Sequence, residues 1–133
     1  MLTAADFRKA ALQRFTTAEF LFEHTYTLDA LYLGGYSVEC ILKSMIMHFT
    51  SAAKQETMFG RLTSGAKMHY PEQLKEILKE LNRLMPAELV KGFRRFGWST
   101  GLRYESGKKP PSEIRGYLKL AKTCIEWVDK ESA

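Results

Sequence analysis

The sequence predicts an all-α protein, an up-and-down antiparallel bundle of four long helices with an additional short helix. Apolar residues recur at helical spacing almost throughout, and no run alternates apolar and polar residues as a strand would. Hydrophobic residues make up 45% of the chain and charged residues 26%, a composition typical of globular proteins. No internal repeat or linker divides the 133 residues, so we expect a single domain over residues 1–133.

Two long helices are expected in the first half of the chain. The first begins near Thr3, where Thr3 and Asp6 suit a capping box, and it continues for about 20 residues. Its core stripe is Phe7, Ala11, Phe15, Ala18 and Phe22. The second covers about residues 28–52 and is interrupted by Gly34 and Gly35. Because glycine destabilises a helix interior, we expect these two residues to let a neighbouring helix approach closely.

The second half is expected to alternate irregular segments with helices. Residues 54–67 are mostly polar and contain two glycines, which predicts a long loop. Helical spacing then predicts a helix over residues 71–85 and a short one over residues 86–96. Three glycines and two prolines predict a non-helical segment over residues 97–111, and Ser112 is expected to cap the last helix. The buried stripe of that helix is Ile114, Tyr117, Leu118, Ala121, Ile125 and Val128.

Composition also excludes several classes of protein. The longest apolar stretch, residues 28–49, carries three charged side chains and a histidine, so we expect no membrane span. The first residues lack the basic-then-apolar order of a secretory signal. Cys40 and Cys124 are far apart and share no zinc-type spacing with the histidines, so we expect no metal and no cofactor. Free thiols of this kind suit a reducing cytoplasm.

Positive charge is concentrated in one segment. The net charge is +5, and the whole excess lies in residues 91–109, where six cations face only Glu105. These cations are Lys91, Arg94, Arg95, Arg103, Lys108 and Lys109. Aromatic residues lie between them, a mixture that can pair phosphates and stack bases. The alternative is that Phe93, Phe96 and Trp98 pack inward and the cations complement the end of a short helix.

A polar strip on the second helix is the other candidate for function. At 100° per residue, Tyr32, Tyr36, Glu39 and Lys43 share one face of this helix, beside its apolar stripe. One interpretation is a solvated face with a Glu-to-Lys pair four residues apart. The other is a ligand-binding groove that also includes Arg103 and Tyr104, in which Glu39 pairs with Lys43 or with Arg103.

The run Tyr32-Leu33-Gly34-Gly35-Tyr36-Ser37-Val38-Glu39-Cys40-Ile41-Leu42-Lys43 resembles the second-helix signature of HEPN domain proteins. Two downstream features agree with this resemblance: His69 before the helix over residues 71–85, and Trp98-x4-Arg103-Tyr104 before the last helix. The resemblance implies a helical bundle that often dimerises. It also implies a bacterial toxin-antitoxin, defence or RNA-processing context, frequently with a minimal nucleotidyltransferase as partner.

Many members of the family are metal-independent ribonucleases with the catalytic signature Arg-x4-6-His, and this chain departs from that signature. Nine residues separate Arg14 from His24, seven separate Arg61 from His69, and no histidine follows Arg103. The imidazole is the side chain best poised for proton transfer near neutral pH. Its absence from this spacing favours binding over catalysis.

The sequence therefore predicts a cytoplasmic, homodimeric HEPN-type bundle that binds RNA or a nucleotide and acts with a partner protein. Two alternatives stay open. One is a metal-independent ribonuclease toxin with an unorthodox site built from Arg103, Tyr104, Glu39 and Lys43, and the other is a plain helix-bundle interaction module. For the homodimer, Leu12 and Phe20 lie outside the core stripe of the first helix and indicate an interface.

Overall fold

The computed structural model describes residues 1–133 and contains α-helices and short 3-10 helices but no strands, which confirms the all-α prediction. Three α-helices are long: α1 Ala4–Glu23, α2 Thr27–Phe49 and α6 Pro111–Glu131. Three are short: α3 Gln55–Leu62, α4 Pro71–Glu80 and α5 Ala87–Phe96. The 3-10 helices are η1 Ala52–Lys54, η2 Ala66–His69 and η3 Thr100–Tyr104. The chain thus has three long and three short helices, where the sequence predicted four long and one short.

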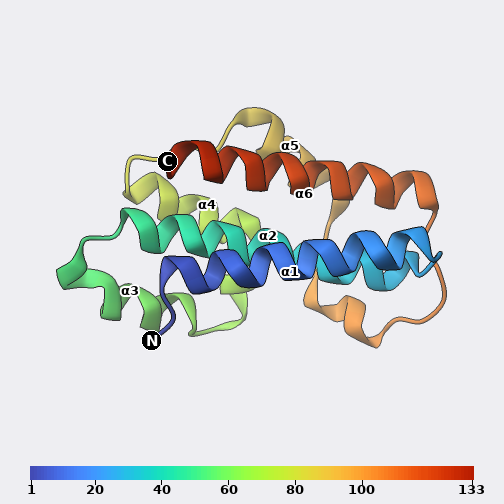
Figure 1. The fold of residues 1–133 in the computed structure, drawn as a ribbon, viewed down its shortest axis with the longest axis horizontal. Coiled ribbons are helices and arrows are strands. Elements are labelled where there is room, and N and C mark those ends of the chain that lie inside the picture. Colours follow the sequence, from blue (N-terminus) through green and yellow to red (C-terminus); the bar gives the residue numbers. More distant parts are fainter.

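Helix α2 is the central element of the structure. It packs along α1 and α6, and α4 and η3 also contact it (Figure 1). The larger core cluster gathers apolar side chains of α1, α2, α4 and α6, including Phe7, Leu42, Ile77 and Ile125. A smaller cluster forms around Trp98 with residues of α1, α2, η3 and α6. None of the helices combines the length with the apolar character that a membrane-spanning helix needs.

Helix α1 begins as its sequence predicts. The Thr3 hydroxyl accepts a hydrogen bond from the Asp6 backbone at 3.2 Å, and the Asp6 carboxylate accepts one from the Thr3 backbone at 2.8 Å, which completes the capping box. Within the predicted stripe Phe7, Ala11 and Ala18 are buried, whereas Phe15 and Phe22 are half-buried. Leu12 packs against the core and is not exposed, so only Phe20 of the two predicted interface residues lies on the surface.

The loop predicted over residues 54–67 is wrong, because this segment contains the last residue of η1, all of α3 and the start of η2. Leu62 is fully buried, and Met58 and Phe59 pack against the larger core cluster. These three side chains share one helical face, so tertiary packing stabilises a short helix in a polar stretch whose local propensity is weak. Figure 1 shows α3 at the end of the molecule near the N-terminus.

Three predicted helix ends also differ. Helix α2 stops at Phe49, where the Thr50 hydroxyl turns back to the Ile46 carbonyl at 2.6 Å. Helix α4 stops at Glu80, before Leu84, because Asn82 adopts a left-handed φ of 61° that ends the helix. Ser112 is not the cap of α6, because Pro110 precedes the helix and Pro111 occupies its first position. The predicted buried stripe of α6 is confirmed in full.

The segment predicted to be non-helical over residues 97–111 contains the 3-10 helix η3, and its last residue, Pro111, begins α6; the rest of it is irregular, as predicted. Gly97 ends α5 in the left-handed conformation, with φ of 57°. The Ser99 hydroxyl then accepts a hydrogen bond from the Gly101 backbone at 3.0 Å and caps η3. Because Trp98 and Leu102 are buried on either side of this cap, η3 is held against α2.

Candidate functional site

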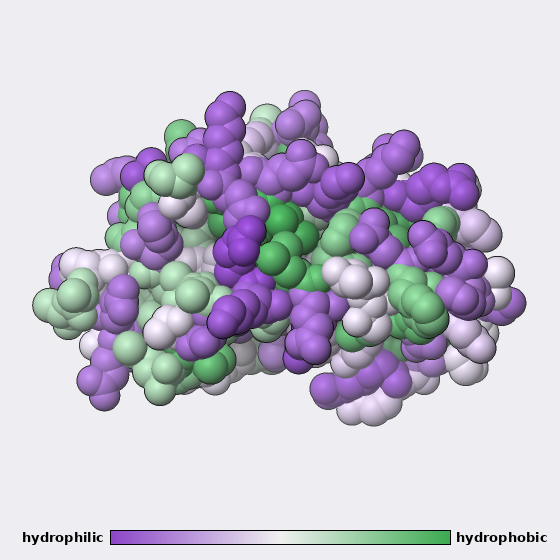
Figure 2. Space-filling model, in the orientation of Figure 1, coloured by the Kyte–Doolittle hydropathy of each residue, from purple (hydrophilic) through white to green (hydrophobic).

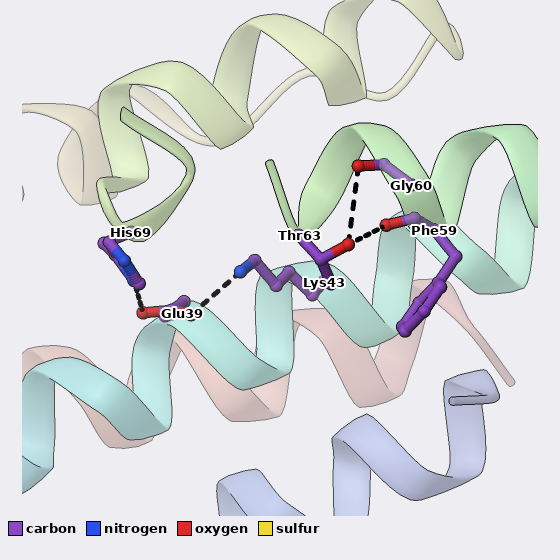
Figure 3. A network of polar contacts seen from close by, with 6 residues as sticks. All are labelled: Glu39, Lys43, Phe59, Gly60, Thr63 and His69. Carbon is purple, nitrogen blue, oxygen red and sulfur yellow. Dashed lines mark hydrogen bonds and ion pairs between the residues drawn. The ribbon is translucent and has the colours of Figure 1, made fainter. Parts of the chain in front are cut away.

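A buried ion pair lies in the middle of α2. The Lys43 ammonium donates to Glu39 Oε2 at 2.8 Å, and the two residues are only 5% and 7% exposed. The solvated-face interpretation of the polar strip is therefore wrong for these two residues. They are covered by the turn after α3 and by η2, which lie over this part of α2 (Figure 3). A buried pair of charges requires good geometry and further hydrogen bonds, because neither ion keeps its water shell.

His69 supplies the further hydrogen bond to Glu39. Its Nδ1 lies 3.0 Å from Glu39 Oε1, so each oxygen of the carboxylate accepts one hydrogen bond, from Lys43 or from His69 (Figure 3). Since an ionised carboxylate only accepts hydrogen bonds, Nδ1 is the protonated nitrogen. The His69 side chain is 38% exposed, in contrast to its partner. Glu39 thus holds the orientation of an imidazole that reaches the surface.

Aromatic rings surround this charged cluster. Tyr36 contacts His69, Tyr32 and Trp98 edge to face, with ring centroids 6.1, 5.1 and 5.2 Å apart. The Trp98 indole donates a hydrogen bond to the Tyr32 carbonyl at 3.3 Å and packs against Tyr70 as well. Burial, together with the Tyr32 phenol and Glu39, raises the pKa of Tyr36 to about 12. The Tyr36 hydroxyl therefore stays protonated near neutral pH and can donate a hydrogen bond.

The close approach of α2 to its neighbours depends on its two glycines. A Cβ on Gly34 would meet Leu118 of α6 at 3.0 Å, which confirms the predicted approach of a helix. At Gly35 the neighbour is not a helix but the Trp98 ring, which lies directly over the missing side chain. This contact positions Trp98 between Tyr36 and the residues of η3.

Arg103 and Tyr104 lie on η3 at the exposed edge of these aromatic rings. The Arg103 guanidinium is 4.9 Å from the centre of the Tyr104 ring and forms no ion pair. Tyr104 chiefly, and Tyr32 and Tyr36 more weakly, raise the pKa of Arg103. Glu39 does not pair with Arg103, because Lys43 and His69 already bind both of its oxygens. The guanidinium is thus free to bind an anion.

The six predicted basic residues fall into two groups on different elements. Lys91, Arg94 and Arg95 lie on α5, whereas the other three follow Gly97. Figure 1 shows α5 and the segment around η3 at opposite edges of the molecule. Two of the cations are neutralised within the chain, since Arg94 pairs with Glu72 at 3.1 Å and Lys109 with Glu105 at 2.9 Å. Lys91, Arg95, Arg103 and Lys108 form no ion pair.

His69 is the site residue that local patterns missed. It lies 30 positions from Glu39 and outside any predicted helix, so no periodicity connects the two. Its place in the family resemblance was the one available signal. The contact depends on η2, which is held over α2 by Met68, packed against the larger core, and by the buried Leu62 and Leu74 on either side of it.

Two distant segments thus lie beside the polar strip of α2: η2, which brings His69, and η3, which brings Arg103. An all-helical fold with these side chains on and beside its central helix is typical of one known family of helical domains. The HEPN domain family matches residues 4–131, nearly the whole chain, and the protein belongs to this family. HEPN domains are generally RNA-related or nuclease-like. Comparison with curated proteins and with solved structures finds no match.

Proposed function

We propose that the protein binds RNA or a nucleotide at the site formed by Tyr32, Tyr36, Glu39, Lys43, His69 and Arg103, which we term the α2 site. The observation that carries this proposal is the buried carboxylate of Glu39, which holds one buried cation and one surface imidazole. A buried ion pair contributes little to stability compared with apolar packing. An apolar residue would serve a purely structural position better, so the charges favour a role in binding.

Each part of the α2 site suits one part of a nucleotide. Arg103 carries a planar guanidinium with no internal ion pair, which can bind a phosphate bidentately. His69 adds a second donor when its free nitrogen is protonated. The half-buried Tyr32 and Tyr36 and the exposed Tyr104 offer faces for base stacking, and such stacking is tolerant of sequence. The chemistry shared by RNA and a free nucleotide is a phosphate next to an aromatic base.

The test replaces Arg103 with lysine, which keeps the charge and removes the bidentate fork. We expect R103K to weaken binding of a fluorescently labelled single-stranded RNA at least about tenfold in an anisotropy titration. The melting temperature should not change, because Arg103 lies on the surface. R95K is the matched control, since Arg95 is an exposed arginine of α5 with no ion pair. The affinity of R95K for the same RNA should stay within about twofold of the wild-type value. Equal losses of RNA affinity in R103K and R95K would contradict RNA binding at the α2 site.

The RNA affinity is also measured at several salt concentrations, and the RNA is checked for cleavage after incubation with the protein. Affinity should fall with a log-log slope of about −0.7 for each phosphate neutralised on a single strand.

A specific observation also favours a second candidate, cleavage of RNA without metal, because a carboxylate-oriented imidazole is the usual arrangement of a general base. Intact RNA after incubation with EDTA indicates binding alone. Shortened RNA ending in a 2′,3′-cyclic phosphate would indicate the ribonuclease.

A partner protein belongs to the same proposal. Family members frequently occur with a minimal nucleotidyltransferase, and a toxin-antitoxin or defence-like context would place such a protein in an adjacent gene. Co-purification of the two gene products as one complex supports this context. A chain that binds no RNA yet forms a stable complex with an unrelated protein would instead be an interaction module.

We further propose a two-fold homodimer through α1 and α6. A groove of about 240 Å³ lies between these helices, and Figure 2 shows apolar surface bordered by hydrophilic side chains on this face. Its apolar lining is Phe15, Phe22 and Leu118. Its charged lining is separated by sign, with Glu19 and Glu23 on α1 and Arg115, Lys119 and Lys122 on α6. None of these five charged side chains forms an ion pair within the chain.

A two-fold axis would bring α1 of each subunit against α6 of the other, so that both acidic edges meet basic edges. We expect wild-type protein to be dimeric by light scattering at tens of micromolar, a concentration at which weak interfaces begin to dissociate. The variant E19K/E23K and the variant R115E/K119E should each be monomeric, because like charges then face each other. An equimolar mixture should form a heterodimer, since both halves of the interface regain opposite charges. A monomeric mixture would contradict this interface.

A further inference from the structure

A second cavity, of about 250 Å³, lies behind the aromatic rings of the α2 site. It opens between the start of α4, the end of α5 and α6. Tyr70, Phe93 and Trp98 form aromatic walls, and the exposed Glu72 and Arg94 line it as an ion pair. Pockets for drug-sized ligands measure roughly 300–1,000 Å³, so this cavity suits a ligand of one or two rings.

Tyr117 adds a hydroxyl to the lining of this cavity, beside the Glu72–Arg94 pair. The residue is 1% exposed and lines the cavity, yet its hydroxyl forms no hydrogen bond within the chain. The buried side-chain atoms that lack both a partner and solvent are Arg83 Nε and Ser132 Oγ, and the Tyr117 hydroxyl is not among them. The small exposed part of Tyr117 therefore includes its hydroxyl oxygen. Because this oxygen has no partner within the chain, a ligand or water in the cavity can supply its hydrogen bond.

We infer that this cavity binds a nucleobase, with the ring between Phe93 and Trp98 and a polar edge of the base at the Tyr117 hydroxyl. Planar aromatic walls favour a planar ring, and a hydroxyl without a partner in the chain favours a ring with polar atoms on its edge over a plain hydrocarbon. The inference rests on the proposed function, because the cavity adjoins the α2 site through two residues. Tyr70 directly follows His69, and Trp98 contacts Tyr36 on its other side.

The test uses nucleosides, which carry no phosphate and so do not depend on Arg103. The chain has two tryptophans, Trp98 and Trp127, and W127F leaves Trp98 as the only one. In that background we expect adenosine, guanosine, cytidine or uridine to quench Trp98 fluorescence in a saturable way, up to the millimolar range. Y117F should weaken the nucleoside that binds best at least about fivefold, because the ring remains while the hydroxyl is lost.

Two controls complete the experiment. Y26F removes the hydroxyl of an exposed tyrosine outside the cavity and should leave nucleoside affinity unchanged. R103K should also leave it unchanged while it weakens RNA binding. If no nucleoside quenches Trp98, or if Y117F and Y26F behave alike, the cavity does not bind a base. RNA binding that still depends on Arg103 would then preserve the proposed function, so the two failures are distinguishable.

Discussion

Replacing Glu39 with glutamine is expected to lower the free energy of unfolding by about 3 kcal/mol, the cost of breaking a buried ion pair. Glutamine fills the same space but removes the only counter-charge of the Lys43 ammonium, which is 5% exposed. Urea titration should show a lower midpoint at an unchanged slope, because the folded structure keeps its shape.

Glu105→Gln is the matched control for this variant. Glu105 and Lys109 are also four residues apart and lie at 2.9 Å, nearly the 2.8 Å of Glu39 and Lys43, but their side chains are 48% and 33% exposed. Exposed pairs contribute little, so this substitution should change stability by less than about 0.5 kcal/mol. A second variant, E39M/K43M, removes both charges together and should recover most of the stability lost in E39Q. Similar midpoints for E39Q and E105Q would show that water reaches Glu39.

The local sequence pattern was sufficient to predict the long helices α1 and α6. Helical spacing predicted α1 with its Thr3 capping box and the whole buried stripe of α6, because these elements bury one continuous face and their local signals agree with their packing. Helical periodicity located the polar strip of α2, and the resemblance on the same helix pointed to the HEPN family, which matches nearly the whole chain. These predictions needed no information about distant contacts.

The burial of Glu39 and Lys43 could not be predicted from α2 alone. The spacing of these two residues on the helix fits a solvated pair as well as a buried one. The turn after α3 and η2 exclude water from them. Helix α3 was itself missed, because its apolar positions Met58, Phe59 and Leu62 stand among polar residues and a glycine. An error in one short helix thus changed the interpretation of the site beneath it.

For the basic segment, residues 91–109, the sequence located the charges but not their partners. Counting charges located the positive excess of residues 91–109, but only the fold divides it between α5 and η3 and pairs two of its members with acids. Glu72, the partner of Arg94, lies 22 positions away in α4, a separation at which no helical periodicity applies. Arg103 stands out from the other cations because of its surroundings, the phenols of Tyr32, Tyr36 and Tyr104, and not because of its charge.

Because Trp98 contacts Gly35, we expect the substitution of Gly35 with alanine to have a large effect on stability. Alanine normally stabilises a helix interior by about 1 kcal/mol relative to glycine, and Gly60 of α3 has open space around it. G60A should therefore raise the free energy of unfolding by up to about 1 kcal/mol. At Gly35 the added methyl group would overlap the Trp98 ring at its nitrogen edge, where the indole donates to the Tyr32 carbonyl.

We expect G35A to lower the free energy of unfolding by about 2 kcal/mol in spite of the better helix propensity, because overpacking typically costs about 1–3 kcal/mol. Tyr32, Tyr36 and Tyr70 contact the Trp98 ring, so the ring can move only toward the cavity and would lose these contacts if it did. Urea titration gives the stability, and Trp98 fluorescence in the W127F background reports displacement of the ring. W98L should make room for the methyl group, so adding G35A to W98L should cost less than adding it to wild type. Equal costs in the two backgrounds would mean that Trp98 does not rest on Gly35, and the aromatic wall shared by the α2 site and the cavity would lose its support.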